Sequence, residues 1–95
     1  MRATINGKRV TDRESLFRLL REKLNLPADC GNNLDAVYDV LTEPGKARIV
    51  ILKNEALLRA ALGDYAERLL RMLEDAEQSG HVKVLRKESG KRNKE

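Results

Sequence analysis

The sequence predicts an α/β protein, with a three-stranded parallel sheet and four helices in the order β-α-α-β-α-α-β. Residues 47–52 form a continuous apolar, β-branched run, typical of a central strand covered on both faces. Two pairs of segments with helical apolar spacing separate this run from strand-like segments near the two ends of the chain. Strands joined by helical crossovers generally pair in parallel, so we expect one sheet with helices packed against it.

The first strand is expected at residues 1–5. The Asn6-Gly7 pair that follows is a strong turn signal and permits a tight hairpin to residues 9–10. The first helix then opens at Thr11, where Glu14 three residues later completes a capping-box pattern. Its apolar face comprises Leu16, Phe17, Leu19, Leu20 and Leu24. The helix ends before Leu26-Pro27, since the residue before a proline disfavours helical angles.

The second helix is expected from Leu34 to Thr42. Asn32 or Asn33 caps its start by accepting a hydrogen bond from a free amide of the first turn. Leu34, Val37 and Leu41 fall on one side of a helical wheel, whereas Asp35 and Asp39 fall together on the other. Tyr38 lies at the border between the two faces, and Glu43-Pro44-Gly45 closes the segment.

The second half of the chain repeats this arrangement after the strand at 47–52. Asn54 is expected to cap a third helix that Gly63 ends, and Asp64 with Glu67 to cap a fourth. The apolar positions of the fourth helix are Tyr65, Ala66, Leu69, Leu70, Leu73 and Ala76. Ser79-Gly80 ends it. The last strand carries Val82, Val84 and Leu85.

Length and composition predict one domain over residues 1–86 and a basic, disordered tail over residues 87–95. The single cysteine, Cys30, is compatible with a reducing compartment, and the longest apolar run is too short to span a bilayer. No signal region follows Met1, so we expect a cytoplasmic protein. With one cysteine and one histidine, no metal or other cofactor is expected.

Charge is distributed unevenly along the chain. The net charge is +4, yet residues 24–45 contain four carboxylates and no Lys or Arg. These four are Asp29, Asp35, Asp39 and Glu43. An anionic segment inside a basic protein repels phosphate and attracts a cationic partner.

Three stretches of the sequence form a recognisable set. They are Ala-Thr-Ile-Asn-Gly at 3–7, Leu-Asn-Leu-Pro at 24–27, and Gly-Asn-Asn-Leu-Asp-Ala-Val-Tyr-Asp-Val-Leu-Thr at 31–42. Together they resemble the barstar family of ribonuclease inhibitors. With the order of elements, the resemblance covers residues 1 to about 86. It implies a non-catalytic protein that blocks a secreted, basic, guanyl-specific ribonuclease of the barnase type with its acidic second helix and the preceding loop.

The resemblance also implies roles for individual residues. Asp39 would take the place of a substrate phosphate, Asp35 would pair with further cations, and Tyr38 would supply an aromatic contact. Gly31 and Asn33 would contribute loop contacts, and Asp75 on the fourth helix a peripheral charge. The remaining candidate contacts border these positions and are Asp29, Thr42 and Glu43. Asp29 stands where the family type has Tyr, and Pro44 where it has Trp.

Other interpretations remain open. Asp35 and Asp39 could be the solvated face of an amphipathic helix, or the chain could bind a basic partner that is not a nuclease. A small RNA-binding protein that uses the basic tail is a further alternative, but three aromatic residues offer little for base stacking. An enzyme that turns over a small-molecule substrate is not indicated, because the sequence contains no Gly-rich phosphate loop and no nucleophile elbow.

Overall fold

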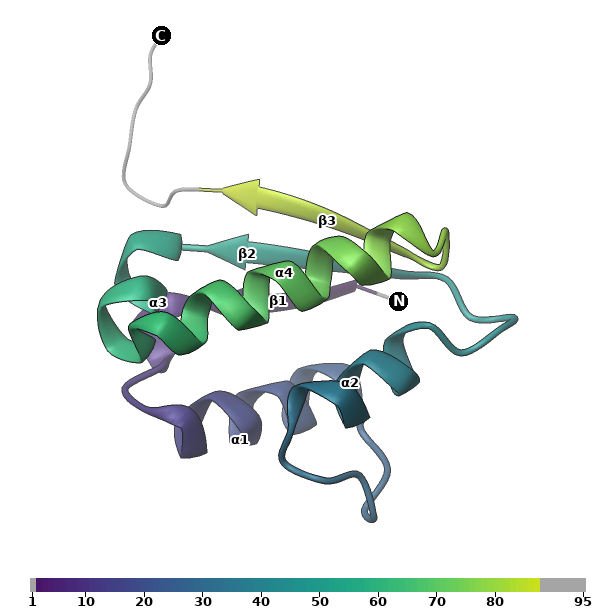
Figure 1. Ribbon diagram of the computed structural model, residues 1–95, viewed down its shortest axis with the longest axis horizontal. Helices are drawn as coiled ribbons and strands as arrows, with labels where there is room; N and C mark the ends of the chain where they lie inside the picture. The colour runs from purple at the N-terminus through teal and green to yellow at the C-terminus, as the bar shows by residue number, and fades with distance from the viewer. Residues whose placement is uncertain (1, 88–95) are drawn as a thin grey trace, which may run out of the picture.

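The computed structural model describes residues 2–87, and the expected tail at 88–95 lies outside the described residues. The expected order of elements is confirmed (Figure 1). The strands are β1 (Arg2–Asn6), β2 (Arg48–Lys53) and β3 (Val82–Lys87). The helices are α1 (Arg13–Leu24), α2 (Leu34–Leu41), α3 (Glu55–Leu62) and α4 (Asp64–Gln78), with a short 3₁₀ turn, η1 (Gly7–Arg9), after β1. Lys87, expected to open the tail, is the last residue of β3.

All three strands run parallel, with β2 in the middle. Alternate side chains of the strands enter one hydrophobic core shared with the helices, and Figure 1 shows α4 running along the strands, with α1 and α2 below it in the view. These inward side chains are Ala3, Ile5, Val50, Leu52 and Val82. The helices thus cover one face of the sheet.

The second face of the sheet carries alternating side chains that lie outside the core. They are Arg2 and Thr4 of β1, Ile49, Ile51 and Lys53 of β2, and Lys83, Leu85 and Lys87 of β3. Ile51 is 8% exposed but is not part of the core cluster. The prediction that helices cover β2 on both faces was therefore wrong for the described part of the chain, and we call this second face the open sheet face.

The hairpin expected at Asn6-Gly7 does not form, because β1 pairs with β2 in parallel and Gly7 begins η1. A Cβ atom at Gly7 would lie 2.3 Å from the carbonyl oxygen of Asn54 and 2.9 Å from the amide nitrogen of Leu58. Glycine is therefore required by a close backbone approach rather than by a turn. Asn6 accepts a hydrogen bond at 2.8 Å from the Asn54 side chain, which ties the end of β1 to the start of α3.

Three predicted helix caps were wrong. Asp12 and Ser15, not Thr11 and Glu14, form the capping box of α1. The bond from the Ser15 amide, together with the Ser15 hydroxyl, lowers the pKa of the Asp12 carboxyl from its ordinary value of 3.8. Asn54 makes no side-chain cap to α3, because its side chain is directed to Asn6, and Gly63 rather than Asp64 precedes α4.

Candidate protein-binding surface

The second helix is positioned by its own cap and by its apolar stripe. Asn33, in extended conformation, accepts a hydrogen bond from the Ala36 amide at 2.8 Å, which decides the choice between Asn32 and Asn33. Val37 and Leu41 are fully buried, at 0% exposure, and fix the inward face of α2 in the core. Because the helical period then sets the outward face, Asp35 and Asp39 lie exposed on it, as the helical wheel predicts.

The two carboxylates of α2 have no ion-pair partner among the described residues. Within residues 2–87, no cationic side-chain nitrogen lies within 4.0 Å of Asp35 or Asp39. Asp35 lies in the first turn, where the helix dipole favours a negative charge, but Asp39 lies one turn further on. Like charges at this spacing repel each other, so a cationic group from outside stabilises both.

The loop before α2 is held by an arginine of α1. Arg21 donates to the Oδ1 of Asn32 at 2.7 Å and to the carbonyl oxygen of Cys30 at 2.5 Å. A Cβ atom at Gly31 would lie 2.8 Å from the side-chain nitrogen of Asn33, so glycine lets the loop approach the cap of α2. Cys30 itself is a free, half-buried thiol.

The carboxyl end of α2 is held by Arg48 of β2. This side chain is 7% exposed, and its Nη1 donates to the carbonyl oxygen of Val40 at 2.6 Å, while its Nε has no partner. A cation at the carboxyl end of a helix is favoured by the helix dipole. Arg48 therefore fixes the acidic helix to the central strand of the sheet.

Replacing Arg48 with alanine is expected to lower the free energy of unfolding by about 2–4 kcal/mol, because a carbonyl loses its donor and a buried volume empties. Urea unfolding followed by circular dichroism measures this loss. The matched control is Lys46→Ala, an exposed cation two residues away, which should change stability by less than about 0.5 kcal/mol. Equal stabilities of the two variants would contradict the anchoring role of Arg48.

A groove of about 710 Å³ lies between α2 and α4. Its walls comprise Leu34, Asp35, Tyr38, Glu67, Arg68, Arg71, Met72, Asp75 and Gln78. The structure thus brings together three of the predicted contacts, Asp35, Tyr38 and Asp75, from two helices far apart in sequence. Tyr38 is half-buried and packs against the core, so its ring is held at the edge of the groove.

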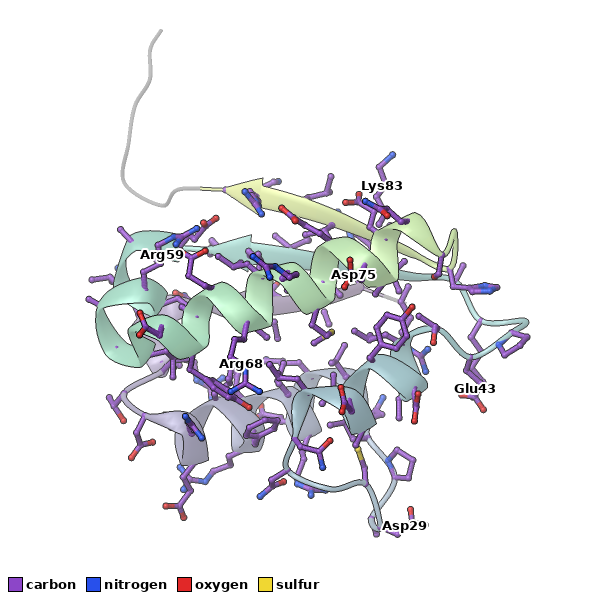
Figure 2. All side chains as sticks on the ribbon, viewed as in Figure 1. Asp29, Glu43, Arg59, Arg68, Asp75 and Lys83 are labelled. Atoms are coloured by element: carbon purple, nitrogen blue, oxygen red, sulfur yellow. The ribbon has the colours of Figure 1, made fainter. Side chains whose placement is uncertain are left out.

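The other predicted contacts surround α2 without joining the groove. Thr42 turns inward, its hydroxyl donating to the carbonyl oxygen of Tyr38 at 2.9 Å, so it closes the helix. Glu43 is exposed after the helix and pairs with Lys46 at 3.8 Å. Figure 2 shows Asp29 and Glu43 at two separate extremities, one on the loop before α2 and the other after the helix.

Sequence reasoning missed the arginines of this surface. Arg68 and Arg71 share a face of α4 with Asp75, at spacings of three and four residues, so the helical period alone could have grouped them. Arg21 and Arg48 reach α2 from other elements, and nothing local in the sequence indicates their contacts.

Neither a metal site nor a membrane span is found in the part of the chain that the structure describes. No three His, Cys, Asp or Glu side chains within residues 2–87 are grouped so that they could hold a metal ion. None of the helices in that range is long and apolar enough to cross a membrane.

The sheet, its four helices and their order define a small α/β protein with a barstar-like fold. The family model described as "Barstar (barnase inhibitor)" matches residues 1–91. A curated relative from Bacillus subtilis (strain 168), named "Putative ribonuclease inhibitor YrdF", is 33% identical over 75 residues, which are 78% of this chain and 82% of the relative. The chain belongs to the barstar family.

Proposed function

We propose that this protein inhibits a ribonuclease by placing α2 and the loop before it in the enzyme's active site. The observation that carries the proposal is the pair of exposed carboxylates, Asp35 and Asp39, that lack any cation within 4.0 Å among the described residues. An enzyme that binds RNA phosphates presents cations in its active site, and a fixed carboxylate can occupy the place of a phosphate. Membership of the barstar family and the name of the Bacillus relative support the same partner class.

Within this proposal, Asp39 replaces a substrate phosphate, and Asp35 binds neighbouring cations of the enzyme. Tyr38 supplies an aromatic contact at the edge of the groove, and Asp75 adds a charge from α4. Gly31 and Asn33 shape the loop, whereas Asp29, Thr42 and Glu43 border the contact. The target is a basic, secreted, guanyl-specific enzyme, and the inhibitor acts in the cytoplasm without catalysis of its own.

The test is capture of partners from secreted and cytosolic fractions of the source organism, followed by an RNA-cleavage assay of the captured material. Wild-type bait is compared with the Asp35→Ala/Asp39→Ala variant. The matched control is Glu14→Ala/Asp64→Ala, which removes two exposed carboxylates outside the groove and gives the same net charge. We expect wild type and control to retain a ribonuclease and inhibit it, and the double variant to release it.

Other outcomes would redirect the proposal. Retention of a basic protein without nuclease activity would keep the site but replace the ribonuclease with another partner. Equal retention of RNA by all three baits would contradict inhibition and favour RNA binding instead.

A further inference from the structure

The groove between α2 and α4 is not uniformly acidic. Arg68 and Arg71 line it beside Asp35 and Asp75, so cations and carboxylates share its walls. Both arginines are exposed, and within residues 2–87 neither lies within 4.0 Å of a carboxylate oxygen. The surface that faces a partner therefore carries two signs of charge, neither of them neutralised by direct pairing.

Two other arginines near α4, by contrast, pair directly with carboxylates. Arg59 pairs with Glu55 and Glu67, and Arg86 pairs with Glu55 and Glu74, forming a network that joins α3, α4 and β3. These bonds raise the pKa of Arg59 above its ordinary value. The network thus connects elements of the fold through paired charges. Arg71 lies four residues before Asp75 on the same helix, yet the two side chains form no ion pair within residues 2–87.

Arg68 is also held in place by an aromatic ring. Its guanidinium carbon lies 5.4 Å from the centre of the Tyr65 ring, while that of Arg13 lies 4.0 Å from the same centre. Tyr65 is buried and makes an edge contact with Phe17 in the core, so the ring that Arg68 contacts is fixed. A cation oriented in this way loses less conformational freedom when a partner binds.

We propose that Arg68 and Arg71 bind a carboxylate on the rim of the target enzyme's active site, and that this contact selects among ribonucleases. The inference rests on the proposed inhibition and adds the chemistry of the partner, a basic cleft with an acidic rim. An enzyme with only cations there would meet the arginines as like charges, and this repulsion weakens its binding relative to an enzyme with an acidic rim.

An alternative role of the arginines predicts the opposite result. If they served only to reduce repulsion between the groove carboxylates, their removal would leave the groove between α2 and α4 more negative, and a basic enzyme would bind more tightly. The sign of the change in affinity therefore separates the two roles.

The experiment measures the dissociation constant of the ribonuclease retained by wild-type bait in the capture experiment, by isothermal titration at two salt concentrations. Arg71→Glu is the main variant because Arg71 makes no hydrogen bond, ion pair or ring contact with another side chain within residues 2–87, and Arg68→Glu is the second. Lys83→Glu, on the open sheet face and far from α2 in Figure 2, is the matched control with the same change in charge. Asp39→Ala is measured beside them.

Arg71→Glu is expected to weaken binding roughly tenfold or more, while Lys83→Glu leaves it within about twofold. Unchanged or tighter binding of the ribonuclease by Arg71→Glu would overturn the proposal that the enzyme's rim carries a carboxylate. If Asp39→Ala alone weakens binding, inhibition stands and this inference fails. If wild type binds no ribonuclease, the proposed function fails and the inference fails with it.

Discussion

Asp39→Ala is expected to weaken binding of the target ribonuclease by about two to three orders of magnitude while leaving the fold intact. Truncating one member of a charge pair that becomes buried leaves the partner's cations without a counter-charge, and such losses typically reach about 2–5 kcal/mol. Since roughly 1.4 kcal/mol corresponds to a tenfold change, the middle of this range, about 3–4 kcal/mol, corresponds to the expected loss of affinity. The change should appear mainly in the dissociation rate.

The free energy of unfolding of the same variant, in contrast to its affinity, should increase slightly. Asp39 is exposed, has no ion pair among the described residues and lies four residues from Asp35, so its removal relieves a like-charge repulsion of about 0.2–0.5 kcal/mol. Surface plasmon resonance and urea unfolding together measure both effects. Asp39→Asn, which keeps the volume and removes the charge, is the control. A loss of affinity below threefold for both variants would contradict the role of this carboxylate.

Gly7→Ala is expected to lower the free energy of unfolding by about 3 kcal/mol or more. The added methyl would lie 2.3 Å from a backbone oxygen of Asn54 and 2.9 Å from a backbone nitrogen of Leu58. Neither atom can move without displacing α3, and overpacking of this kind costs about 1–3 kcal/mol or more even where side chains can adjust. Because a small domain is stable by only about 5–15 kcal/mol, the loss is a large share.

Gly31→Ala provides the comparison for this prediction. Its methyl would lie 2.8 Å from the side-chain nitrogen of Asn33, a flexible side chain whose oxygen caps α2, so we expect a loss of about 1 kcal/mol, the value of that cap. Chemical unfolding of both variants measures the difference. Equal stability of wild type and Gly7→Ala would mean that η1 and α3 separate readily, against the close approach described above.

The order of helices and strands could be predicted because the spacing of apolar residues within each segment indicates its type of secondary structure. The helical wheel also placed Asp35 and Asp39 on the exposed side of α2, since the side opposite a buried stripe is fixed locally. The errors occurred where a distant segment competes with a local signal. Asn6-Gly7 is a hairpin signal by itself, but β1 pairs with a strand more than forty residues later, and Gly7 meets the backbone of α3.

The groove could not be predicted for the same reason. Arg68, Arg71 and Asp75 belong to one face of α4, but only packing of α4 beside α2 brings them to Asp35 and Tyr38. From the sequence Arg48 is predicted only as a residue beside or within a strand. Its contact with the Val40 carbonyl depends on how α2 packs relative to the sheet. Local periodicity therefore predicts which side chains α2 exposes, whereas tertiary packing decides which charges surround them.

The open sheet face and α2 carry charges of opposite sign, and this pair of charged surfaces forms an electric dipole. Arg2, Lys53, Lys83 and Lys87 stand on the open sheet face, and the carboxylates of α2 stand on the side of the helix layer. The field of a cationic enzyme exerts a torque on such a dipole and turns α2 toward the enzyme before the surfaces touch. At physiological salt, where the Debye length is about 8 Å, this alignment acts only in the last stage of approach, so the association rate should rise as salt is removed.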